Sequence, residues 1–223
     1  MSKPSYVETL AIAHRAGNSL AGLHEANELG VDVIECDVHH HRGGLEVRHL
    51  KTAGPLPFLW DRWELVPASA PRLGLRELLA ADRHGTTFML DLKGGRPALG
   101  IEVARLLHEV AGEHPVLACG RHWGQVEVVS RLPFVRDVYS ARNRRELARL
   151  RDRLRAGPRA YGVSIHRSLL GPPLVEELLD RVEVVMTWPV DDLATLDAVL
   201  ATGANGIIST EPEVLREVRR RQG

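Results

Sequence analysis

Apolar runs of strand length alternate with segments of helical spacing along almost the whole chain. This alternation is typical of βαβ units, in which helices join parallel strands. We predict strands at residues 8–14, 31–38, 86–93, 115–119, 135–140, 161–166, 182–188 and 205–209. Segments with helical spacing, several of them ending at glycine, lie between these strands at residues 20–30, 98–112, 124–132, 142–154, 172–181 and 191–203.

The number of strands narrows the fold class. Eight strands with intervening helices in 223 residues predict an α/β protein, a (β/α)8 TIM barrel that forms a single domain over residues 1–223. A doubly wound open sheet is the structural alternative. A Gly-Gly pair at residues 43–44 departs from the alternation, because it separates two strand-like runs and so predicts a hairpin. The hairpin would fold residues 45–49 back beside the end of the second strand and return His49 toward it.

The stretch after the hairpin, residues 51–74, is rich in proline, glycine and tryptophan and has no helical period. We interpret it as a long loop over one end of the barrel, where function tends to reside. Trp60 and Trp63 fit a packing role in this loop, with a lip for a lipid chain as the alternative.

Charge and composition exclude some functions. The 29 basic residues balance the 29 acidic ones, so no global field favours nucleic acid or an anionic membrane. No apolar run approaches the roughly 18 residues of a membrane span, and the first residues lack the apolar stretch of a secretory signal. We therefore expect a cytoplasmic protein without stable membrane insertion or a nucleic-acid partner. Cys36 and Cys119 lie in apolar strands and fit reduced core thiols, and the oligomeric state stays open.

Acidic side chains stand at the ends of two predicted strands. Because successive side chains of a strand point to opposite faces, Glu35 and Asp37 share one face, and Asp91 and Lys93 share another. The carboxyl ends of barrel strands surround a single site. Neighbouring carboxylates repel one another, so they share a proton or hold a cation between them. Three carboxylates without a thiolate favour Mg²⁺ or Ca²⁺ over zinc.

At these strand ends the sequence resembles the glycerophosphodiester phosphodiesterase superfamily. That pattern has a His-Arg pair on strand one, Glu-x-Asp on strand two, a second histidine after a hairpin, an acidic-x-Lys on strand three and a late Trp and Gly-Ile-Ile. Here it is "AHRAG" (13–17), "IECDV" (34–38), "VRHL" (47–50), "LDLK" (90–93), "VMTWPVDD" (185–192) and "GANGIIST" (203–210). The resemblance implies a barrel hydrolase that releases an alcohol and glycerol 3-phosphate with a divalent cation and two catalytic histidines.

The resemblance also implies a role for individual residues. His14 and His49 would be the catalytic residues. The phosphate and the alcohol would be bound by Arg15, Lys93 and Trp188. The ligands of Mg²⁺ or Ca²⁺ would be Glu35, Asp37 and Asp91. The expected partner is a small-molecule phosphodiester or a lysophospholipid.

Some positions depart from the family pattern and keep alternatives open. Asp91 stands where these enzymes more often have glutamate, which looks more like the sphingomyelinase D and phospholipase D toxin branch. The glutamate of the family's Pro-Glu-Asn-Thr is missing from "AGNSL" at 16–20, and Leu50 follows His49 in place of aspartate. One alternative is phospholipase D-like release of a head group from lysophospholipids with formation of a cyclic phosphate. Another is a barrel that binds phosphoesters without catalysis.

Overall fold

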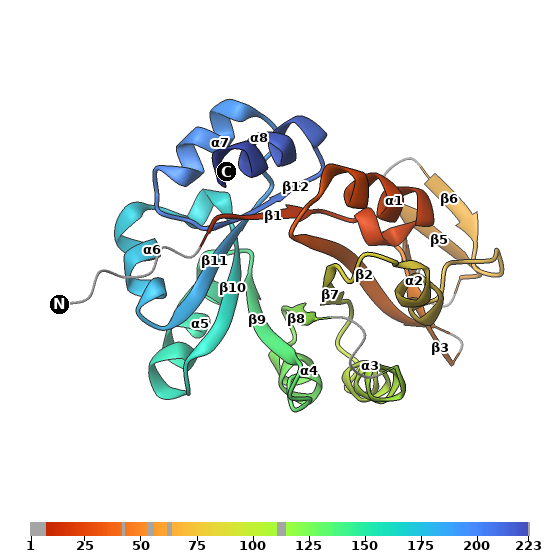
Figure 1. Ribbon diagram of the computed structural model, residues 1–223. Coiled ribbons are helices and arrows are strands. Elements are labelled where there is room, and N and C mark those ends of the chain that lie inside the picture. The colour runs from red at the N-terminus through yellow and green to blue at the C-terminus, as the bar shows by residue number, and fades with distance from the viewer. Residues whose placement is uncertain (1–7, 42, 53–55, 62–63, 111–114, 223) are drawn as a thin grey trace.

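Eight parallel strands close into a barrel in the computed structural model, which describes residues 8–41, 43–52, 56–61, 64–110 and 115–222 (Figure 1). The barrel strands are β1 (Leu10–Ala13), β2 (Val33–His41), β7 (Thr87–Leu92), β8 (Val116–Gly120), β9 (Val135–Ala141), β10 (Ala160–His166), β11 (Val182–Trp188) and β12 (Gly206–Ser209). They follow the order β1-β12-β11-β10-β9-β8-β7-β2, and the pairing of β1 with β2 completes the ring. The TIM barrel and its eight predicted strands are confirmed, and the closed ring rules out the open sheet.

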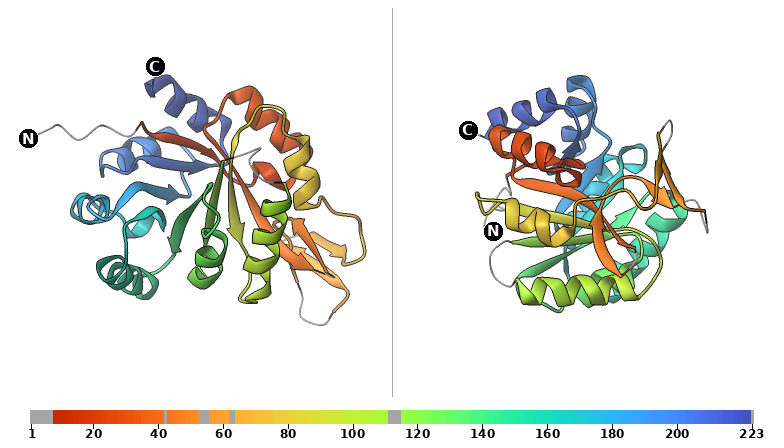
Figure 2. Two further views of the ribbon diagram at one scale, coloured as in Figure 1. Left: turned by 60° about the horizontal axis from the view of Figure 1, so that its bottom comes forward. Right: turned by 90° about the vertical axis from the view of Figure 1, so that its right-hand side faces the viewer.

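Helices cover the outside of the ring (Figure 2). They are α1 (Leu20–Leu29), α2 (Leu75–Ala81), α3 (Ala98–Glu109), α4 (Trp123–Val129), α5 (Arg144–Ala156), α6 (Pro172–Leu179), α7 (Leu193–Leu200) and α8 (Pro212–Gln222), with short 3-10 turns η1 (Ala16–Asn18) and η2 (Arg167–Leu169). Helix α2 was not predicted, because a helix of seven residues shows hardly two turns of apolar spacing. None of the described helices is long and apolar enough to cross a bilayer.

Two apolar layers hold the barrel together, one inside the ring and one between the strands and the helices. On β7 the side chains alternate between them, since Met89 belongs to the inner cluster whereas Phe88 and Leu90 belong to the outer one. The same alternation turns Asp91 toward the inside, two residues beyond Met89, at the carboxyl end of the strand. The two cysteines are free and buried, as expected.

The segment after the hairpin differs from the predicted loop. The hairpin is confirmed, because β3 (Gly44–Val47) pairs antiparallel with β2. Beyond it, β4 (Lys51–Thr52), β5 (Phe58–Asp61) and β6 (Glu64–Pro67) form a separate three-stranded antiparallel sheet outside the ring (Figures 1 and 2). Strands of two to four residues carry too little alternation to stand out between prolines and glycines. Trp60 is 44% exposed, so the packing role predicted for it is wrong, and Trp63 lies outside the described residues.

A close backbone contact fixes the turn between β1 and α1. A Cβ atom on Gly22 would lie 2.5 Å from the carbonyl oxygen of Ala16. Because backbone yields less readily than a flexible side chain, we expect Gly22→Ala to lower the free energy of unfolding by about 1–3 kcal/mol in urea titrations. The matched control is Gly124→Ala, since nothing lies within 4 Å of the added Cβ at that helical position. Equal stability of the two variants would contradict the expectation.

Candidate active site

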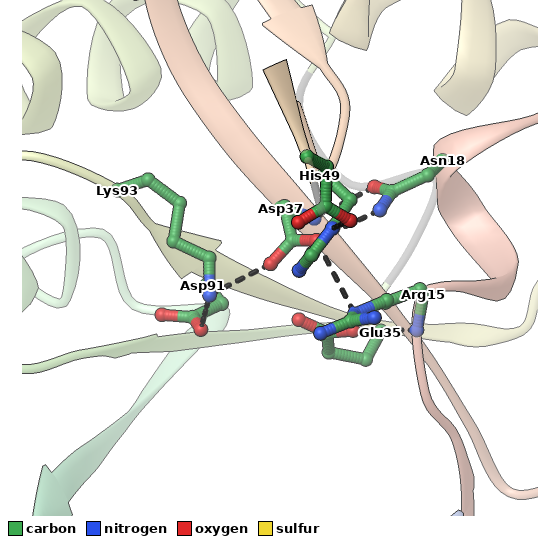
Figure 3. Close-up of polar contacts among 8 residues, drawn as sticks. Arg15, Asn18, Glu35, Asp37, His49, Asp91 and Lys93 are labelled. Atoms are coloured by element: carbon green, nitrogen blue, oxygen red, sulfur yellow. Dashed lines mark hydrogen bonds and ion pairs between the residues drawn. The ribbon is translucent and has the colours of Figure 1, made fainter. Parts of the chain in front are cut away.

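Three carboxylates converge at the carboxyl ends of the adjacent strands β2 and β7. The strand register places Asp37 opposite Asp91 and Glu35 opposite Met89. Glu35, Asp37 and Asp91 each offer an oxygen within 4.8 Å of the others (Figure 3). Glu35 and Asp37 are 2% and 1% exposed. The structure therefore brings together the three side chains that the sequence predicted as metal ligands.

Lys93 supplies a positive charge to this cluster. Its Nζ lies 2.7 Å from Asp37 Oδ1 and also contacts the Asp91 carboxylate. Burial lowers the pKa of Lys93, but the charges of Asp91 and Asp37 outweigh burial and raise the pKa above its usual value. The ammonium is therefore charged throughout the neutral range and neutralises one of the negative charges.

Arg15 contacts the cluster through its backbone as well as its side chain. Its φ of 61° places it in the left-handed region, which costs energy for a residue with a Cβ. In this conformation its backbone N–H donates a hydrogen bond of 2.6 Å to Glu35 Oε2. Its guanidinium Nε lies 3.9 Å from Asp37 Oδ2. The unusual backbone conformation of Arg15 thus places the N–H group that orients the Glu35 carboxylate.

Asn18 is a site residue to which the sequence analysis gave no role. Its Nδ2 donates to Asp37 Oδ2 at 2.8 Å, and its Oδ1 accepts from the Asp37 backbone N–H at 2.8 Å. The turn η1 that carries Asn18 packs tightly on β2, since a Cβ on Gly17 would lie 2.8 Å from Cys36 Cβ. In the sequence, Asn18 is marked only as a polar residue shortly after a His-Arg pair at a strand end. Polar residues at such positions are too common to indicate a functional role.

The charges of the cluster fit a bound cation. Burial, followed by repulsion from Asp37, raises the pKa of Glu35 well above its usual value. Burial also pushes the pKa of Asp37 upward, but Lys93 and the hydrogen bond from Asn18 outweigh it and lower that pKa. Lys93 and the Arg15 guanidinium bring two positive charges to three carboxyl groups, so ionisation of all three leaves a negative charge uncompensated. An oxygen-only donor set with excess negative charge suits a hard divalent cation.

His14 follows β1 on the same rim, where its backbone N–H donates to the Ser209 carbonyl at 2.8 Å. Burial, together with the charge of Arg15, lowers the pKa of His14 to about 4. The imidazole is therefore neutral at physiological pH and can accept a proton. The charges of Lys93 and His49 act in the same direction, and that of Asp37 acts against them.

His49 is held by an acid from the small sheet. Its Nδ1 lies 2.6 Å from Asp61 Oδ2, and Asp61 is the last residue of β5. Because an ionised carboxylate only accepts hydrogen bonds, we assign a hydrogen to Nδ1, which leaves Nε2 for other chemistry. Asp61 was not predicted as a site residue, since nothing in the sequence indicates that a strand returns it to a histidine twelve positions earlier.

Trp188 ends β11 and packs partly buried on the inner cluster of the barrel. Its ring meets the ring of His166 edge to face, with centroids 5.0 Å apart. The two residues are paired in register on β10 and β11. Trp188 therefore lies on the carboxyl side of the barrel.

The closed ring and the acidic cluster on its carboxyl rim define a (β/α)8 barrel with a candidate metal-binding active site. The chain is similar to an Oleispira antarctica phosphodiesterase solved with its product sn-glycerol-3-phosphate, with 17% identity, a TM-score of 0.73 and 94% of this chain and 96% of that chain covered. It is also similar to the glycerophosphodiester phosphodiesterase of Thermotoga maritima, with 14% identity, a TM-score of 0.71 and coverage of 96% and 100%. A third such enzyme, from Agrobacterium tumefaciens, has 17% identity, a TM-score of 0.67 and coverage of 95% and 99%.

These likenesses show that the chain shares the barrel fold of these enzymes, which is the fold that the resemblance implied. The sequence matches no protein-family model and no curated protein.

Proposed function

We propose that this protein hydrolyses glycerophosphodiesters and releases an alcohol and glycerol 3-phosphate. The observation that carries the proposal is the cluster of Glu35, Asp37 and Asp91, with oxygens within 4.8 Å of one another, on the rim that also carries His14 and His49. The product-bound phosphodiesterase of the same fold supports the choice of substrate class.

Glu35, Asp37 and Asp91 would hold the divalent cation, Mg²⁺ or Ca²⁺, through carboxylate oxygens. When bound, the cation would neutralise charge that grows on the phosphate oxygens in the transition state. Asn18 and Lys93 fix the orientation of the Asp37 carboxylate, and the Arg15 backbone N–H fixes that of Glu35. The ligands are therefore oriented before a substrate arrives, which lowers the reorganisation needed for binding.

The two histidines divide the proton transfers. His14 is neutral at physiological pH and accepts the proton of the attacking water as general base. When His49 is protonated, Nδ1–H donates to Asp61, and Nε2–H supplies the proton that the leaving alkoxide takes up. One proton is taken and one is given, so the pair returns to its starting state after the protons exchange with water.

Arg15, Lys93 and Trp188 complete the proposed site. The Arg15 side chain is 41% exposed, so its guanidinium is accessible to a phosphate oxygen. Lys93 contacts two of the carboxylates, so it would both neutralise part of their charge and bind the phosphate. Trp188 offers an aromatic surface to the alcohol or to a choline-like head group.

A second candidate reaction follows from Asp91. An aspartate at this strand end, in contact with Lys93, is the feature that favours phospholipase D-like chemistry. In that reaction a hydroxyl of the substrate, activated by the same base, would attack phosphorus and give a cyclic phosphate in place of glycerol 3-phosphate. The non-catalytic alternative is less well supported, because both histidines and all three carboxylates lie on one rim.

The test is turnover of glycerophosphocholine and lysophosphatidylcholine by the purified protein, with products identified by phosphorus NMR. We expect glycerol 3-phosphate from glycerophosphocholine, and loss of turnover on chelation that added Mg²⁺ or Ca²⁺ restores. A cyclic phosphate would assign the phospholipase D-like reaction. No turnover of either diester in the presence of both ions would overturn the proposed hydrolysis.

Asp61 offers a narrower test of the catalytic arrangement. Asp61→Asn keeps the size of the side chain but replaces a pure acceptor by an amide that can present a donor to Nδ1. We expect kcat to fall roughly 10–100-fold with a smaller change in KM, because His49 loses the acceptor that orients its ring. The matched control is Asp152→Asn, an exposed position on α5, and a fall in kcat of the same size there would contradict the role of Asp61.

A further inference from the structure

The outer face of the β4–β5–β6 sheet exposes large apolar side chains. Six large hydrophobic side chains are exposed among the described residues, and four of the six lie between residues 51 and 67. They are Leu56, Phe58, Trp60 and Leu65, which are 61%, 40%, 44% and 66% exposed. We call Lys51, Phe58, Trp60 and Leu65 the outer patch.

The strand register arranges the outer patch as a row. Trp60 pairs with Lys51 on one side and with Leu65 on the other, so the three side chains share a face of the sheet. Lys51 Nζ lies 5.3 Å from the centroid of the Trp60 ring. Of the residues with described side chains on this face, none is acidic. The row thus joins an aliphatic, an aromatic and a cationic side chain.

The opposite face of the same strand belongs to the candidate active site. On β5, Phe58 and Trp60 point outward, whereas Leu59 is fully buried and Asp61 holds His49. Four consecutive residues therefore alternate between the surface and the site. A partner bound to the outer patch would therefore contact the same strand that carries Asp61, the acid that orients His49.

The size and composition of the outer patch decide between two kinds of partner. Its apolar surface is on the order of 400 Å², well below the roughly 800 Å² per partner of a stable protein interface. Tryptophan and phenylalanine favour the boundary between lipid head groups and acyl chains, and a lysine beside them reaches the phosphates. We propose that the outer patch docks on a phospholipid surface, with Trp60, Phe58 and Leu65 among the acyl chains and Lys51 on the anionic phosphates.

Docking on lipid would bring the proposed enzyme to its substrate, so the benefit of docking rests on the proposed function. The binding itself does not depend on it. A lysophospholipid in a lipid surface is itself a glycerophosphodiester, and docking would hold the rim of the barrel against the surface that contains it. Binding to lipid needs no turnover, so the docking and the hydrolysis are tested separately.

The experiment is co-sedimentation of the full chain with vesicles of equal parts phosphatidylcholine and phosphatidylglycerol. We expect the double variant Phe58→Ser/Trp60→Ser to bind at least about tenfold more weakly than the wild type, because two apolar side chains no longer enter the lipid. Lys51→Ala is expected to weaken binding about fivefold on these vesicles and to leave binding to pure phosphatidylcholine unchanged. Ile101→Ser is the matched control, since Ile101 is 57% exposed on α3, and it is expected to bind like the wild type.

Circular dichroism of each variant establishes that it is folded. Absence of vesicle binding by the wild type, or equal binding by the wild type and the folded double variant, would overturn the proposal. Sedimentation velocity that shows a dimer of the wild type, dissolved by the same two substitutions, would overturn it in favour of a second copy. Vesicle binding without diester turnover would support the docking and count against the hydrolysis, whereas turnover without vesicle binding would do the reverse.

Discussion

Replacing either histidine of the rim with alanine is expected to lower kcat by about 10²–10⁴-fold, the usual contribution of one general acid or base. His14→Ala removes the neutral imidazole that accepts a proton, and His49→Ala removes the imidazole that Asp61 holds. Because both changes remove interactions of the transition state, KM should change much less than kcat. Initial rates with glycerophosphocholine at saturating divalent cation measure both constants.

The matched control for these variants is His24→Ala, an exposed histidine on α1, which should retain the wild-type rate. The double variant should be little slower than the slower single variant, because the two histidines serve one reaction. A His14→Ala or a His49→Ala protein with the wild-type kcat would exclude that residue from the proposed acid–base pair.

Glu35→Gln is expected to have opposite effects on stability and on cation binding. In the metal-free protein the pKa of Glu35 is raised by burial and by Asp37, so its ionisation costs folding free energy. Between the pKa of the unfolded chain and the raised pKa, the unfolded state ionises first and stability falls as the pH rises. Glutamine does not ionise, so at pH 7 the metal-free variant should unfold roughly 2–8 °C higher than the wild type.

Thermal unfolding with and without Mg²⁺ or Ca²⁺ measures both effects. Added cation should stabilise the wild type, and this shift should be largely lost in Glu35→Gln because one of three carboxylates is gone. Near pH 4, where Glu35 is protonated in either state, the metal-free difference should shrink. Glu28→Gln, an exposed change on α1, controls for the substitution itself. A metal-free variant less stable than the wild type at pH 7 would contradict the pKa argument.

The barrel could be predicted because its strands are buried in a repeated context. The run at residues 182–188, for example, is buried on both faces except at Glu183 and, in part, Trp188, and the helix α7 follows it. The small sheet could not be predicted in this way, since β5 has only four residues and its exposed face is apolar. An apolar side chain that faces solvent, such as Trp60, breaks the alternation on which sequence reasoning depends.

In the candidate site, too, some residues could be predicted from the sequence and others could not. Glu35, Asp37 and Asp91 could be placed together because strand alternation and parallel pairing fix where they point. Asn18 and Asp61 could not, since their positions depend on how a turn and a separate sheet fold against the rim. Long-range contacts of this kind leave no periodic trace in the residues that make them.

The alternation along β5 also sets how this protein can be altered in length. A single residue inserted between Phe58 and Trp60 would move the rest of the strand to the opposite face. Asp61 would then point to solvent and an aromatic ring toward His49. Length changes within this strand therefore keep Asp61 on the side of His49 only in steps of two.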